Sequence, residues 1–316
     1  MDKITRWIAF LAAAVAASLA TPALAEDKTP ETSAQAAPSA DGNTETQATV
    51  PAHPALWKVA DDDTTIYLFG TIHALPSGID WFEGKVADAF DKSGELVTEI
   101  VKEDPKTMQG LVLSRAMLSG DQTLRSLLSP EEKADYEAAL TAFGVPVQAF
   151  DRFEPWYAAV GLSTVPLMRD GFAAKHGVEE TLDARAEALG HTHGALETAE
   201  YQLDLFDALP LDVQKRYLDQ VVEDLPTMRE DLKKMVEAWM RGDAEELARL
   251  MNAQEDDPAL VEALLTGRNR NWAKWIEERL EKPGTVFLAV GAGHLAGEGS
   301  VQDQLGEAGI STERVQ

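Results

Sequence analysis

The sequence predicts an α/β fold of the α+β kind. We expect a central mixed, partly parallel sheet formed by both chain ends, with a large, mostly helical insertion between them. Two apolar, β-prone runs near opposite ends support this, because each leads into Gly-x-x-His, at residues 70–73 and 291–294. A helix candidate and a third strand candidate, residues 95–100, follow the first run, which is the order typical of parallel strands.

The first 25 residues are typical of a secretory signal peptide. Lys3 and Arg6 give a positive start, residues 8–19 form a short apolar run, and residues 23–25 match a small-x-small cleavage site. The run is shorter than the ~18 apolar residues of a membrane-spanning helix. We therefore expect export to a Gram-negative periplasm, cleavage after Ala25 and no insertion into the membrane.

Residues 26–53 are expected to form a disordered linker, because they are rich in Ala, Thr, Pro, Ser, Gln and Glu and have little apolar surface to bury. A single domain is expected over residues 54–316. Its β-prone residues 56–59 and 64–69 flank an Asp-Asp-Asp turn, which predicts a hairpin leading into the first Gly-x-x-His. A helix is expected over residues 80–93, ahead of the third strand candidate.

The insertion is expected to cover about residues 104–190 and 200–280, with a short strand over 192–198 between its two parts. Apolar residues at i, i+3 and i+4 predict its helices. The expected helices span 105–118, 129–143, 155–168, 177–190, 200–208, 211–222 and 225–250, the last of these interrupted at residues 242–243, and one more runs on from residue 258. The chain is expected to close with a strand (285–290), a helix (300–307) and a terminal strand (310–315).

Charge and cysteine content narrow the range of functions. The chain has 28 Lys and Arg against 54 Asp and Glu, a formal net charge of −26. Such an acidic surface argues against nucleic acid and anionic lipid as partners, and it attracts cations. The absence of cysteine excludes disulfides, thiolate nucleophiles, Cys-ligated metal or haem sites and a lipoprotein anchor.

Four polar residues stand at or just past the carboxyl ends of expected strands: His73, Glu99, Glu197 and His294. Ligands of open α/β sheets bind beyond these strand ends. Imidazoles and carboxylates are ligands of divalent metals, so His73, Glu99 and His294 are predicted to hold a divalent metal ion. Each residue also has a structural alternative: hydrogen bonding for a single histidine, surface exposure for Glu99, and the start of the next helix for Glu197.

Several short segments together resemble one known family. They are residues 55–59 (ALWKV), 68–73 (LFGTIH), 177–179 (GVE), 196–198 (LET), 268–269 (RN) and 290–294 (VGAGH). In this order they are similar to the TraB/GumN family, which is related to the Tiki proteins, metal-dependent proteases that act on Wnt. The resemblance runs from about residue 54 to the C-terminus.

The resemblance implies a metal-dependent peptidase, with manganese or cobalt as the metal of the Tiki branch. His73 and His294 match the two motif histidines, and Glu99 matches the acid of the second strand. Arg268 matches the arginine of a late helix, and Glu197 lies in the Leu-Glu-Thr segment.

The leading hypothesis is an exported metal-dependent hydrolase, preferably a peptidase, acting on a peptide or small molecule. The ion would lower the pKa of a bound water from ~15.7 towards ~7, and Glu197 would take the proton of that water. Arg268 would face the developing oxyanion.

Two alternatives stay open. One is a metal-independent, esterase-like hydrolase with a histidine as general base. The other is a periplasmic protein that binds a peptide or polymer without turnover. Trp81 and Phe82 beside the first motif suit that role if they are exposed, and pack in the core if they are not.

Overall fold

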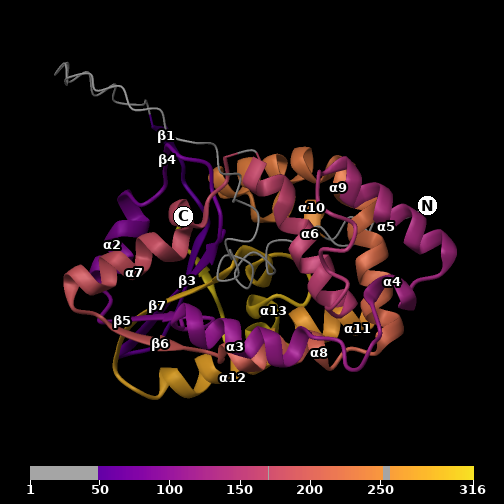
Figure 1. The fold of residues 1–316 in the computed structure, drawn as a ribbon. Coiled ribbons are helices and arrows are strands. Elements are labelled where there is room, and N and C mark those ends of the chain that lie inside the picture. The colour runs from indigo at the N-terminus through magenta and orange to yellow at the C-terminus, as the bar shows by residue number, and fades with distance from the viewer. Residues whose placement is uncertain (1–48, 170, 252–256) are drawn as a thin grey trace, which may run out of the picture.

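The computed structural model describes residues 49–169, 171–251 and 257–316, so the predicted signal peptide and most of the predicted linker lie outside the described residues. The α/β prediction is confirmed by a six-stranded mixed sheet with helices around it (Figure 1). The sheet has the order β6-β5-β7-β3-β2-β8. These strands are β2 (Leu56–Ala60), β3 (Thr64–Thr71), β5 (Glu95–Thr98), β6 (Thr192–Ala195), β7 (Gly284–Gly291) and β8 (Glu313–Arg314).

Both ends of the chain build this sheet, as predicted. The early hairpin of β2 and β3 is antiparallel, and β3 pairs in parallel with the late strand β7, so that Thr71 lies opposite Gly291. On the other side of β7, β5 also runs parallel, with Thr98 opposite Ala289. The predicted parallel orientation of β3 and β5 is therefore confirmed, with β7 between them. The two Gly-x-x-His segments leave neighbouring strands at the same edge.

Helices cover both faces of the sheet. On one face lie α2 (Gly84–Lys92) and α7 (Val178–Leu189), and on the other α12 (Gly267–Leu280) and α13 (Val301–Glu307). Residues of β7 alternate between the two cores: Phe287 packs with α2 and α7, whereas Val286 and Leu288 pack with α12. A strand with both faces buried reads as a continuous apolar run, which is how β7 appears in the sequence.

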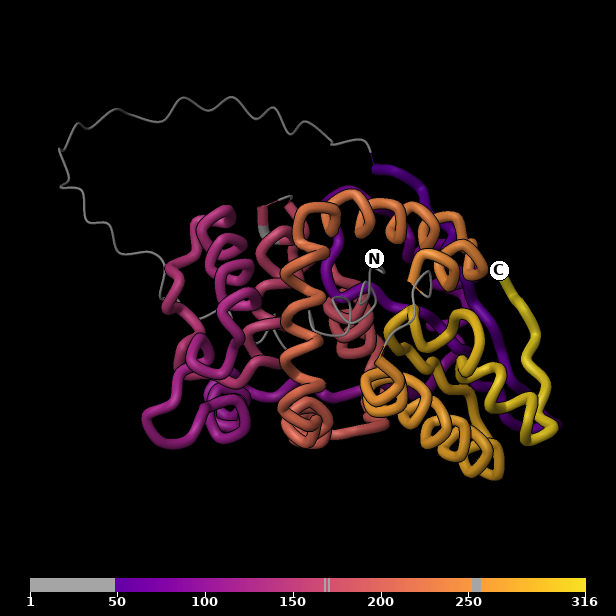
Figure 2. The backbone as a smooth tube through the Cα atoms, turned by 90° about the vertical axis from the view of Figure 1, so that its right-hand side faces the viewer, coloured from indigo at the N-terminus to yellow at the C-terminus, as the bar shows by residue number. Residues whose placement is uncertain are grey.

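The helices of the predicted insertion lie beside the sheet (Figure 2) and enclose a third core. Its helices are α3 (Pro105–Ala116), α4 (Leu124–Leu127), α5 (Pro130–Ala142), α6 (Pro155–Arg169), α8 (Ala199–Asp207), α9 (Leu211–Met240), α10 (Ala244–Met251) and α11 (Pro258–Val261). A π-helical turn, Glu262–Thr266, joins α11 to α12. In the part of the chain that the structure describes, no helix is long and apolar enough to cross a membrane.

The prediction of separate helices over 211–222 and 225–250 was wrong, because α9 continues through Pro226 to Met240. A proline removes one helical hydrogen bond and crowds the preceding turn. Val222 and Leu225 before it and Met228 after it are all buried, and their packing holds the helix together across this site.

Two further details concern the predicted linker and Trp81. Within the predicted linker, β1 (Val50–Pro51) pairs in parallel with β4 (Ile79–Asp80), so the ordered fold begins before residue 54. Trp81 is only 4% exposed and stacks on Phe69 with ring centroids 5.5 Å apart. Its core packing removes Trp81 as an exposed aromatic contact for a polymer.

Candidate active site

Four of the five predicted site residues form one buried cluster at the carboxyl edge of the sheet. Glu99 follows β5, Glu197 follows β6, His294 follows β7, and Arg268 comes from the first turn of α12. The backbone N–H of Gly291, at the end of β7, donates to Glu99 Oε1 at 2.8 Å, which ties two neighbouring strand ends together. The cluster follows from the strand order, because β5 and β7 end side by side.

Arg268 is the centre of this cluster. Its Nε and Nη2 donate to Glu197 at 3.0 and 2.7 Å, and Nη2 also donates to Glu99 Oε2 at 2.6 Å. Its Nη1 reaches the Leu264 carbonyl at 3.3 Å and His294 Nε2 at 3.1 Å. A guanidinium has five N–H groups, and the hydrogen bonds just described use all five. Burial would raise the pKa of Glu99, but the Arg268 charge beside it holds that pKa well below its usual range.

A hydrogen bond to Asn269 determines which ring nitrogen of His294 carries the proton. The Asn269 amide nitrogen donates to the Gly299 carbonyl at 2.8 Å, so its Oδ1 faces the imidazole, 2.6 Å from His294 Nδ1. An amide oxygen only accepts, so Nδ1 carries the proton and Nε2 presents a lone pair to Arg268. Burial and the Arg268 charge together lower the pKa of His294 to about 3. The ring is therefore neutral at pH 7.

His73, the fifth predicted residue, forms a separate pair with Glu179. Its Nδ1 lies 2.6 Å from Glu179 Oε1, while its Nε2 is buried and has no hydrogen-bond partner among the described residues. Burial alone would lower the pKa of His73, but the Glu179 carboxylate outweighs it and raises that pKa above 6.5. Glu179 stands in the first turn of α7, where the helix dipole favours a negative charge.

Gly177 allows α7 to approach closely enough for this pair to form. A Cβ at this position would lie 2.1 Å from the carbonyl oxygen of His73, a distance that no side chain tolerates. The next residue, Val178, donates its N–H to the carbonyl of Ile72 at 3.1 Å. The start of α7 is thus fixed directly against the first motif.

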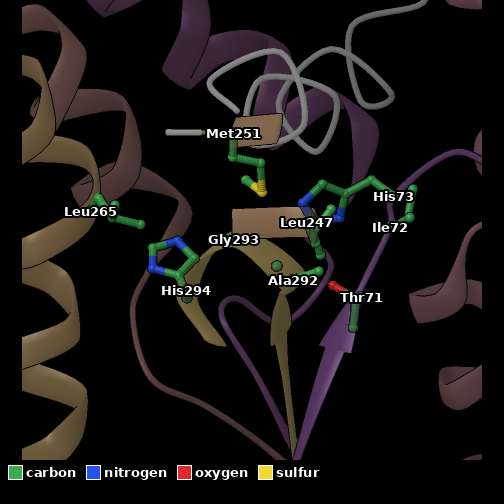
Figure 3. A pocket seen from close by; sticks show the side chains of 10 residues that line it. Thr71, Ile72, His73, Leu247, Met251, Leu265, Ala292, Gly293 and His294 are labelled. Carbon is green, nitrogen blue, oxygen red and sulfur yellow. The ribbon is translucent and has the colours of Figure 1, made fainter. Parts of the chain in front are cut away.

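Two cavities meet at His73. A small one of about 20 Å³ is bordered by both motif histidines, which Figure 3 shows on opposite sides of it. That volume is enough for one water molecule. A larger pocket of about 320 Å³ is lined by His73, Glu99 and Glu179, together with residues of the segment after β5 and of α7. His73 thus borders both a water-sized space and a substrate-sized one.

The predicted metal ligands do not fit an ion in the arrangement observed. Among the residues that the structure describes, no group of three or more His, Asp or Glu side chains could hold a metal. Glu99 accepts from Gly291, Arg268 and Gln202, and His294 Nε2 faces the Arg268 cation. The divalent ion therefore stays a prediction, as do the catalytic roles proposed for Glu197 and Arg268.

Three residues of the site were absent from the predicted set: Glu179, Asn269 and Gln202. Gln202 donates to both Glu99 and Glu197, at 3.0 and 2.9 Å. The segments at residues 177–179 and 268–269 already contained Glu179 and Asn269, so the sequence held a signal for both. Gln202 lies on an amphipathic helix, α8, and nothing in that pattern sets it apart.

Comparison with known proteins identifies the family of this chain. The model of the TraB/PrgY/gumN family matches residues 55–314. An uncharacterized protein of Treponema pallidum is 25% identical over 268 residues, 78% of each chain. The uncharacterized protein YbaP of Escherichia coli is 25% identical over 190 residues, 60% of this chain and 70% of YbaP. No solved structure matches at a significant level. Since the family model spans both Gly-x-x-His motifs and all the site residues described above, the chain belongs to the TraB/PrgY/gumN family.

Proposed function

We propose that this protein is a hydrolase in which His73 is the general base. The observation that supports this most directly is the state of its two ring nitrogens. Nδ1 is held by the Glu179 carboxylate, Nε2 is buried and has no hydrogen-bond partner in the described part of the chain, and the residue lines both cavities. A histidine oriented by a carboxylate, with its other nitrogen directed at the reaction centre, is the arrangement of a general base.

The reaction follows from these positions. Glu179 accepts the Nδ1–H of His73, which leaves the lone pair of Nε2 free. A water in the small cavity bonds through its oxygen to the carbonyl carbon of an ester or peptide in the larger pocket, while Nε2 takes a proton from that water. The same proton passes to the leaving alkoxide or amine as the C–O or C–N bond breaks. Glu179 stabilises the imidazolium between the two steps.

The buried cluster supports this base electrostatically. The charge of Glu99 raises the pKa of His73 further, and the charge of Arg268 lowers it. Both residues tune the pKa of the base, and His73 remains the group that takes the proton. The hydrogen bonds of Arg268 to Glu99 and Glu197 also fix the ends of strands β5 and β6. In this proposal the cluster positions the catalytic residues and does not itself react.

Replacing His73 by alanine tests the proposal. We expect hydrolysis of a panel of quenched peptides and aryl esters to fall by about 10²- to 10⁴-fold, the usual contribution of a general base. The matched control is His53→Ala, which removes an exposed histidine that lines neither cavity. Full activity in the His73 variant would rule out this base.

The same assay separates this proposal from the metal-dependent hypothesis. Wild-type activity is expected to survive exhaustive dialysis against a chelator. Activity that disappears on chelation and returns with manganese, cobalt or zinc would instead support the predicted metalloprotease.

Replacing Glu179 by glutamine is expected to change the pH dependence. A general base is lost as pH falls through its pKa, and the Glu179 charge places the pKa of His73 above 6.5. Without that charge the acid limb of the kcat profile should move to lower pH, and kcat should fall by roughly 10²-fold or more. Glu187→Gln, an exposed position later on α7, is the control and should leave the limb in place. An unchanged limb in the Glu179 variant would contradict the pairing.

A further inference from the structure

We infer that the 320 Å³ pocket receives the side chain of a lysine or arginine in the substrate. This inference rests on the proposed function, because the pocket is the one that opens onto His73. Among the residues that the structure describes, its lining holds five carboxylates and, His73 apart, a single basic residue, Lys102. The carboxylates are those of Glu99, Glu103, Glu179, Glu180 and Asp183.

The negative charge of the pocket is only partly balanced by the protein. The Arg268 charge balances Glu99, whereas Glu179 accepts a hydrogen bond from His73, whose imidazole is uncharged when it acts as the base. The Asp183 side chain is 31% exposed, but its Oδ1 is shielded and has no hydrogen-bond donor among the described residues; His193 Nδ1 lies 3.7 Å from it.

The hydrogen bonds of Thr98 show why His193 supplies no donor there when it is neutral. The Thr98 hydroxyl donates to the Ile100 carbonyl at 2.8 Å, so it accepts from His193 Nε2 at 2.9 Å. The proton of the neutral ring is therefore on Nε2, and a lone pair faces Asp183. A cation in the pocket would satisfy this carboxylate.

The distribution of the charge favours an organic cation over a metal ion. Within the described part of the chain, no three carboxylates or imidazoles are close enough to hold one ion. The pocket has the size of small-molecule sites, and Ile100, Pro105 and Met108 give it apolar walls. Lysine and arginine combine a charged end with a chain of methylene groups, and such side chains lay that chain along apolar surface.

The protein already places an ammonium group in this pocket. Lys102 pairs with Glu180, and their side chains are 65% and 43% exposed. An exposed ion pair of this kind contributes little to stability, so a substrate cation can displace Lys102 from Glu180. Lys102 therefore competes with the substrate, and its removal should strengthen binding of a cation.

Calorimetric titration with agmatine, a small alkyl guanidinium, tests the inference without any turnover. Agmatine is expected to bind the full chain, and the affinity should fall about tenfold in Glu180→Gln and in Asp183→Asn. Lys102→Gln should bind several-fold more tightly. Glu187→Gln and Lys133→Gln carry the same charge changes outside the pocket and should bind as the wild type does. Absence of agmatine binding, or equal losses in the control variants, would overturn the inference.

Hydrolysis is then measured with peptides that differ only in one residue, lysine, glutamine or glutamate. Preference for the lysine peptide, expressed mainly in KM, supports the inference, and equal cleavage of all three contradicts it. Agmatine binding without cleavage of any peptide or ester would reject the proposed hydrolase while retaining the cation site. The two proposals can therefore fail separately.

Discussion

Replacement of Arg268 by methionine is expected to lower the free energy of unfolding by about 3–5 kcal/mol. The side chains of Arg268, Glu99 and Glu197 are 3%, 7% and 5% exposed. Without the guanidinium, two buried carboxylates keep their desolvation cost and lose the charge that balances it. Methionine fills a similar volume, so the loss reports on charge more than on packing.

Arg270 supplies a matched control on the same helix. It pairs with Glu262 through side chains that are 47% and 57% exposed, so its replacement by methionine should cost at most about 1 kcal/mol. Urea unfolding of both variants at pH 7 gives the comparison. The triple variant with Arg268→Met, Glu99→Gln and Glu197→Gln should regain part of the loss, because it removes the uncompensated charges. Equal losses in the two arginine variants would show that the buried cluster is not held by Arg268.

The buried position of this cluster was predictable in part. Glu99, Glu197 and His294 were found because each directly follows a β-prone run, and parallel strands end at a common edge. The repeated Gly-x-x-His pattern indicated that the two chain ends meet, and the pairing of Thr71 with Gly291 agrees. Such local patterns can be recognised in a sequence because they depend only on the spacing of apolar residues and on the order of the elements along the chain.

The partners of these side chains were not predictable in the same way. Glu179 reaches His73 only because Gly177 lets the start of α7 approach the first motif. The role of Arg268 as counterion to two carboxylates depends on the packing of α12 against the sheet. Helix periodicity marks which face is buried, but it does not identify the atom that a buried polar side chain will meet. The predicted break before Pro226 failed for a related reason, since tertiary packing there outweighs a local preference.

Acid is expected to destabilise the protein through His294, by on the order of 5 kcal/mol between pH 6.5 and 3. The folded-state pKa of this ring is about 3, against an ordinary value of 6.5, because a proton would place a second charge beside Arg268 in a buried site. In this interval the unfolded chain binds the proton and the folded chain does not. Stability therefore falls as pH falls below 6.5, and His294 contributes no pH dependence above that value.

The interval from pH 4.5 to 6.5 separates this effect from those of Glu99, Glu179 and His73. Glu99 and Glu179 have lowered pKa values, so their contributions are lost only below the ordinary value of 4.5. His73 has a raised pKa, so its contribution is complete below 6.5 and disappears only as pH rises through the folded-state pKa. Urea unfolding of the wild type should thus lose about 3 kcal/mol over these two pH units. In His294→Gln this slope should disappear, whereas His53→Gln should retain it. The same slope in wild type and His294→Gln would mean that the imidazole is not held neutral, and the hydrogen bond from Arg268 Nη1 to a lone pair on His294 Nε2 would then not exist.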